Sequence, residues 1–181
     1  MKSKDNLYIT ILTVLSTIVF LGLTYLTHER YLVFFSYEWE DIAGWNFVLW
    51  NISKGNFDQV LNIFSLTTLG ELPLSPTSLI TIIPLYVAYP SIKTLFFTTS
   101  LVVAFSSLPL FKIASKLLKD QFSGFFLALS FLVYAPKNIM VMLDGDPIIL
   151  SIFFIPLCIY FAQEKHFKSF LITSLITAFI R

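Results

Sequence analysis

The stretch that decides the fold is Leu7–Leu26, LYITILTVLSTIVFLGLTYL, which contains no charged residue. A helix needs roughly 20 apolar residues to cross the hydrocarbon core of a bilayer. Lys2 and Lys4 precede the stretch, and polar residues follow it at positions 28–30. A signal peptide has a shorter apolar core and a small-residue cleavage site. We therefore interpret Leu7–Leu26 as a retained transmembrane helix.

The composition of the whole chain agrees with a membrane protein. Hydrophobic residues make up 56% of the 181 residues and charged residues only 13%, against about 25% charged in a typical soluble domain. These values exclude a soluble globular domain, a disordered chain and a collagen-like chain. Cys158 is the single cysteine, so no internal disulfide can form. The net charge of +1 gives no basic field for nucleic acid.

Further apolar segments predict an all-α polytopic bundle that forms one transmembrane domain over residues 1–181. The expected crossings after the first are Thr94–Phe111, Gln121–Pro136 and Pro147–Gln163, and a last apolar segment, Ser169–Ile180, follows them. The uncharged stretch Leu72–Ile92 holds four prolines, which break helices. We expect its cleanest piece, Ser78–Tyr89, to be an interfacial or re-entrant helix. Because the last segment is too short for a crossing, we expect this chain to be the N-terminal part of a longer protein.

Positive charge predicts the orientation of the bundle. Lysines cluster at positions 2–4, 112–119 and 165–168. If Ser78–Tyr89 does not cross, all three clusters fall on the cytoplasmic side, together with the N-terminus; if it crosses, they fall on opposite sides. We adopt the first topology, which describes a multi-pass protein of the plasma membrane. It makes residues 28–93 a first outer loop, with an interfacial helix over Asp41–Ile52 that ends at Gly55.

The first candidate site is a group of three acids at the start of this outer loop, Glu38, Glu40 and Asp41. Carboxylates this close repel one another, which favours a raised pKa for at least one of them. A carboxylate at a membrane surface can act as a general base or bind a divalent ion. The alternative is a solvated loop in which Asp41 caps the next helix. Both interpretations stay open at this point.

The second candidate site is the turn Asp144-Gly145-Asp146-Pro147, at the outer end of a predicted crossing. Two carboxylates one residue apart can hold a hard cation such as Mg²⁺ or Mn²⁺. The alternative is a turn and helix cap, which favours the same residue types. The predicted topology places this turn on the same face as the first acidic group.

Outer cations form a third set. These cations could hold a lipid phosphate, or they could extend from helix ends toward the lipid headgroups. The second explanation is preferred for Lys93. The set is Arg30, Lys93, Lys137 and Arg181. His28 and His166 are predicted on opposite sides of the membrane and cannot share a metal ion.

Several of these stretches resemble domain-of-unknown-function family 2079, a family of polytopic membrane proteins. The resemblance runs through EWEDIAGWNFVLWN, the S-P and P-L-Y elements, a basic P-L-F-x-x-A-x-x-L-L end and LDGDP. The matching positions are Asp41, Trp50, Asn51, Ser75, Pro76, Pro84, Leu85, Tyr86, Pro109, Leu110, Phe111, Ala114, Leu117 and Leu118. The chain differs from the family pattern at the second acidic position of the first element, where it has Asn46.

That family is grouped with the GT-C glycosyltransferases, so the resemblance implies sugar transfer from a polyprenyl-phosphate donor on the outer face. It implies that Asp41 accepts the acceptor's proton, with Glu40 in support. It also implies a D-x-D-like pair, here Asp144 and Asp146, for a divalent ion or the donor phosphate. Expected partners are membrane lipids and the lipid-phosphate sugar, with Lys137 and Arg181 as candidate phosphate contacts.

Two other function classes remain as alternatives. A transporter would place ionisable residues inside its helices near the membrane midplane. No such residue occurs in three of the predicted crossings, Thr94–Phe111, Gln121–Pro136 and Pro147–Gln163. A non-catalytic membrane scaffold would need no site at all.

Overall fold

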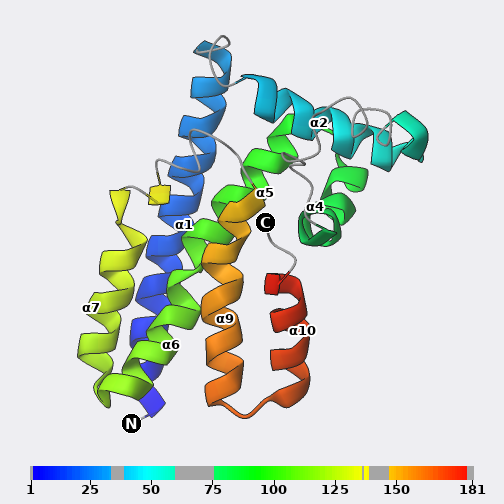
Figure 1. Cartoon of the computed structure of the whole chain (residues 1–181). Helices are drawn as coiled ribbons and strands as arrows, with labels where there is room; N and C mark the ends of the chain where they lie inside the picture. The colour runs from blue at the N-terminus through cyan, green and yellow to red at the C-terminus, as the bar shows by residue number, and fades with distance from the viewer. Residues whose placement is uncertain (1, 34–38, 60–75, 136, 139–146, 179–181) are drawn as a thin grey trace.

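Every regular element among the described residues is a helix (Figure 1). The computed structural model describes residues 2–33, 39–59, 76–135, 137–138 and 147–178. Two helical stretches, Asn6–Leu32 and Ile92–Leu118, are long and apolar enough to cross a membrane. The predicted all-α fold is therefore confirmed.

Helix α1 (Lys2–Val33) packs along α5 (Ile92–Phe105). Three pairs show that the two helices run antiparallel. The ring centroids of Tyr31 and Phe96 lie 5.5 Å apart, Leu23 shares a buried cluster with Val103, and the Ser16 and Ser107 hydroxyls are 2.9 Å apart. The end of α1 that follows the apolar run Leu7–Leu26 therefore lies beside the start of α5.

Helices α5 and α6 (Ser107–Leu118) follow one another with only Ser106 between them. The Ser106 hydroxyl donates to the carbonyl of Val103 at 2.6 Å, and Pro109 lacks the N–H that would continue the α5 bonding pattern. The predicted crossing Thr94–Phe111 thus spans this joint.

Helix α7 (Gln121–Leu132) returns along α6. Asp120 caps its first turn, with Oδ2 accepting from the Ser123 N–H at 2.7 Å. Gly124 faces Ser115 of α6 so closely that a Cβ there would lie 2.7 Å from the Ser115 backbone nitrogen. Glycine therefore permits the close approach of these two helices.

A second helical pair follows, consisting of α9 (Ser151–Gln163) and α10 (Phe167–Ala178), with a 3₁₀ turn (Pro147–Leu150) before α9. The predicted segment Pro147–Gln163 therefore begins as a 3₁₀ turn. Helices of 12 or 13 residues are about 20 Å long, which is shorter than the roughly 30 Å hydrocarbon core.

Helices α2 (Trp39–Ser53) and α4 (Pro76–Ala88) lie at the end of the bundle where α5 begins (Figure 1). The predicted helix Asp41–Ile52 is confirmed, and so is its end. Gly55 has a φ of 75°, its N–H donates to Ile52, and the Asn56 N–H donates to the Asn51 carbonyl at 2.9 Å. This pattern is a Schellman motif, in which the left-handed residue is normally glycine.

The first residues of α1, the α6–α7 turn and the α9–α10 turn all lie at the opposite end of the bundle (Figure 1). A salt bridge of 3.1 Å between Lys116 and Glu164 joins the two turns. Two lysines in these turns, Lys119 and Lys165, adopt left-handed conformations, with φ of 54° and 58°. The basic turns therefore share one end, and α2 and α4 share the other.

Candidate functional site

The predicted acidic residues are only partly within the described residues. Glu40 and Asp41 lie in the first turn of α2, but the described side chains do not include theirs. Asp144, Asp146 and Arg181 fall outside the described residues. A shared site would require the Asp41 carboxylate to lie within about 10 Å of Asp144 or Asp146, so that one ion and a phosphate could bridge them; this distance stays a prediction.

The helix that begins with these acids is fixed by contacts farther along it. The Tyr86 hydroxyl of α4 donates to Oδ1 of Asn46 at 2.5 Å. Tyr86 and Leu49 also lie in one buried cluster with Ile82 of α4 and Leu95 of α5. Asn46 thus supplies the acceptor that positions α2 against α4, which a carboxylate at this position could also do.

Lys137 is described, and it is buried rather than open to the surface. Its side chain is 4% exposed, and Nζ lies 4.6 Å from the centroid of the Phe131 ring and 3.4 Å from the Leu132 carbonyl. Burial lowers the pKa of the Lys137 ammonium from 10.5 to about 8. The described contacts therefore hold this lysine at the end of α7.

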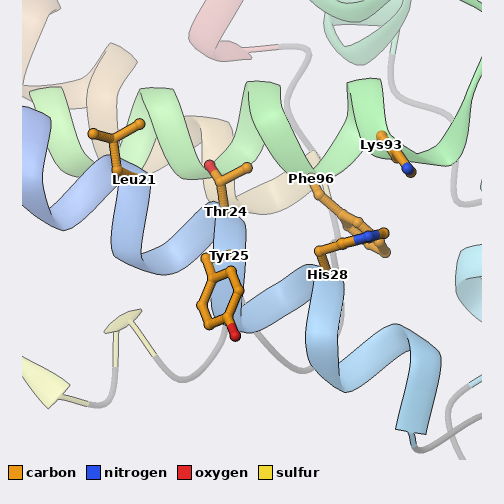
Figure 2. A pocket seen from close by; sticks show the side chains of 6 residues that line it. All are labelled: Leu21, Thr24, Tyr25, His28, Lys93 and Phe96. Carbon is orange, nitrogen blue, oxygen red and sulfur yellow. The ribbon is translucent and has the colours of Figure 1, made fainter.

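A pocket of about 280 Å³ lies where the end of α1 meets the start of α5. It is lined by Leu21, Thr24, Tyr25, His28, Lys93 and Phe96. Figure 2 shows the first four along α1 and the last two on α5. The proximity of His28 and Lys93 in one pocket was not predicted from the sequence, although an antiparallel register of two long helices would have indicated it.

Two polar atoms of α1 beside this pocket have no hydrogen-bond partner in the described part of the chain. Nδ1 of His28 and the Thr24 hydroxyl are buried and have no partner among the described residues. Thr13 and Thr17 of α1 each donate to the carbonyl four residues earlier, at 2.8 Å, whereas the buried hydroxyl of Thr27, outside the pocket lining, also has no partner among the described residues. Buried polar groups usually have partners, so the two atoms at the pocket are unsatisfied polar groups beside a cavity.

A protein metal site is not visible in this part of the chain. Among the described residues, no group of three or more His, Cys, Asp and Glu side chains is placed to hold an ion. His28 lines the pocket on α1, whereas the α9–α10 turn, which contains His166, lies at the other end of the bundle (Figure 1).

Comparison with protein-family models, with curated proteins and with solved structures finds no match to this chain. The described residues define its class as an all-helical protein with two helices long and apolar enough to cross a membrane.

Proposed function

We propose that the chain is a multi-pass protein of the plasma membrane with its N-terminus in the cytoplasm. The support is the arrangement of its basic residues. The lysines of the α6–α7 and α9–α10 turns lie at the same end of the bundle as the start of α1 (Figure 1). Lysine-rich short loops stay on the cytoplasmic side during insertion, so one orientation accounts for all of these clusters.

Within this topology, we propose that the protein transfers a sugar from a polyprenyl-phosphate donor to an acceptor hydroxyl on the outer face. The observation that supports it is the position of α2, which begins with Glu40 and Asp41 at the end of the bundle away from the basic turns (Figure 1). The acceptor oxygen would bond to the anomeric carbon as the bond from that carbon to the lipid phosphate oxygen breaks.

Each acidic residue has a role in this reaction. Asp41 would take the proton that the acceptor hydroxyl loses, and Glu40 would support it. Asp144 and Asp146 would hold Mg²⁺ or Mn²⁺ against the leaving phosphate, whose negative charge grows as the bond breaks. Lys137 and Arg181 are further candidates for phosphate contact.

Cysteine labelling tests the topology. In a Cys158→Ala background, a cysteine at Ser53 should react with an impermeant maleimide added to the outside of intact cells. A cysteine at Ser115, on α6, should react only after the membrane is opened. External labelling of the Ser115 variant would place the basic turns outside and overturn the proposed orientation.

The Asp41→Asn variant tests the reaction. Vesicles containing the protein and a radiolabelled polyprenyl-phosphate hexose should transfer label to an acceptor, and Asp41→Asn should slow this at least about a hundredfold. Asparagine caps helices nearly as well as aspartate, so a capping role predicts unchanged turnover. Asp58→Asn, an exposed acid in the same loop, is the matched control and should keep wild-type turnover.

A further inference from the structure

The pocket between α1 and α5 has one basic end and one apolar flank. Lys93 is exposed at the start of α5, and its ammonium has no hydrogen bond or ion pair among the described residues. Leu21 and Tyr25 of α1 are 59% and 62% exposed. Along a membrane-spanning helix such side chains face lipid, so the pocket opens toward the bilayer.

The floor of the pocket is aromatic. Phe96 is 1% exposed and packs edge-on against Tyr31 of α1, with 5.5 Å between ring centroids. The next residue of α5, Phe97, packs against Phe20 of α1, with 5.0 Å between ring centroids. These contacts hold the two helices at a fixed spacing and leave the groove between them available to an apolar chain.

The histidine supplies a directed donor. Nδ1 of His28 is buried and has no partner among the described residues, which leaves Nε2 as the other nitrogen of the ring. Nε2 is then the nitrogen that a ligand in the pocket can reach. An N–H at Nε2 and the Lys93 ammonium, which carries a formal positive charge, would make two donors.

We propose that this pocket binds the phosphodiester of a bilayer glycerophospholipid. One positive charge balances the single negative charge of a phosphodiester, and charge-assisted donors are the groups that bind phosphate oxygens most strongly. A volume of about 280 Å³ lies at the low end for ligand pockets, which suits a headgroup whose acyl chains lie outside along Leu21 and Tyr25. The inference does not depend on sugar transfer, because any bilayer supplies the ligand.

Native mass spectrometry of the purified chain in detergent micelles doped with phosphatidylglycerol tests the proposal. The wild-type protein should retain one phosphatidylglycerol molecule. Lys93→Gln should weaken its binding roughly tenfold, His28→Phe should weaken it while keeping the ring, and Lys93→Arg should retain it. Lys54→Gln removes an exposed lysine outside the pocket and should change nothing. Equal binding by Lys93→Gln and the wild type would overturn the proposal.

Three competitors distinguish the possible ligands. Diacylglycerol, which has the same chains without phosphate, should not displace phosphatidylglycerol; if it does, the site recognises only the chains and the proposal is wrong. Inorganic phosphate at millimolar concentration should not displace it either, and displacement would indicate a site for soluble phosphate. A polyprenyl-phosphate hexose that competes more strongly than phosphatidylglycerol would reassign the pocket to a sugar donor.

Discussion

Two groups of helices differ in how they bury apolar side chains. The first group is α1, α5, α6 and α7, and the second is the pair α9 and α10. Leu12 of α1, Phe111 of α6 and Ala128 of α7 meet in one buried cluster. Helix α9 has no buried residue, and α10 has only Thr173. Yet α9 and α10 are more apolar in sequence than α1 and α6. The apolar composition of a helix therefore indicates whether it can lie in an apolar environment. How tightly the helix packs against its neighbours depends instead on small residues and on specific polar contacts.

The contact between α6 and α7 should be the most sensitive point of the first group. A valine at Gly124 would force its side chain into the backbone of Ser115, where a Cβ already lies 2.8 Å from Cα. We expect Gly124→Val to lower the free energy of unfolding by about 3 kcal/mol, measured by thermal unfolding in detergent. Gly22→Ala is the matched control: nothing lies within 4 Å of its Cβ, so it should be neutral or slightly stabilising. Equal stability of the two variants would show that the close contact between α6 and α7 does not limit the stability of the first group.

Lys137 gives the packed region a pH dependence. Its pKa is about 8 in the folded protein against 10.5 ordinarily, so between these pH values the unfolded chain binds more protons and stability rises with pH. We expect a gain of about 2 kcal/mol across that window, seen as a rising unfolding midpoint in detergent. Lys137→Met should remove this rise and should be more stable than the wild type at pH 7. A carboxylate partner for the ammonium would instead make the wild-type curve as flat as that of the variant.

The hydroxyl pair between α1 and α6 should contribute less. Ser16 and Ser107 are both buried, and their oxygens lie 2.9 Å apart. Ser16→Ala should cost about 1 kcal/mol in the same unfolding measurement. Thr17→Val alters the next residue, whose hydroxyl donates only within its own helix and is exposed, and it should change little. A larger loss in Thr17→Val would show that contacts within α1 matter more than contacts between helices.

The smallest effect is expected in α10. Leu175 is 60% exposed, so Leu175→Ala leaves no cavity. The substitution should change the free energy of unfolding by less than about 0.5 kcal/mol. Leu12→Ala, in a fully buried site, should cost at least about 2 kcal/mol and serves as the comparison. If Leu175→Ala destabilises the protein as much, α10 packs against something beyond the described contacts.

Much of the fold follows from the sequence because each helix depends on local chemistry. Gly55 ends α2, and the apolar run Leu7–Leu26 lies within α1, as predicted. Helix ends were harder, because α1 continues through the polar residues 28–30 and Pro147 begins a 3₁₀ turn. These boundaries depend on packing with other elements, which periodicity does not report.

The site was less predictable than the fold. Lys93 was expected to reach the headgroups alone, and His28 was considered only as a metal ligand. Their shared pocket arises from the register of α1 and α5, set by pairs such as Tyr31–Phe96 and Leu23–Val103 that are distant in sequence. The roles of Asp41, Asp144 and Asp146 remain predictions, because a contact between them would depend on the tertiary fold and not on local sequence.

The two left-handed lysines have a consequence for how such a chain can change over generations. Glycine would suit the backbone at Lys119 and Lys165 better by about 1 kcal/mol each. Under the proposed orientation, however, these lysines help to direct insertion. Selection for stability and selection for the direction of insertion therefore oppose each other at both positions. A lineage that acquired glycines there would gain stability of the fold and lose part of the signal that determines the orientation of the protein in the membrane.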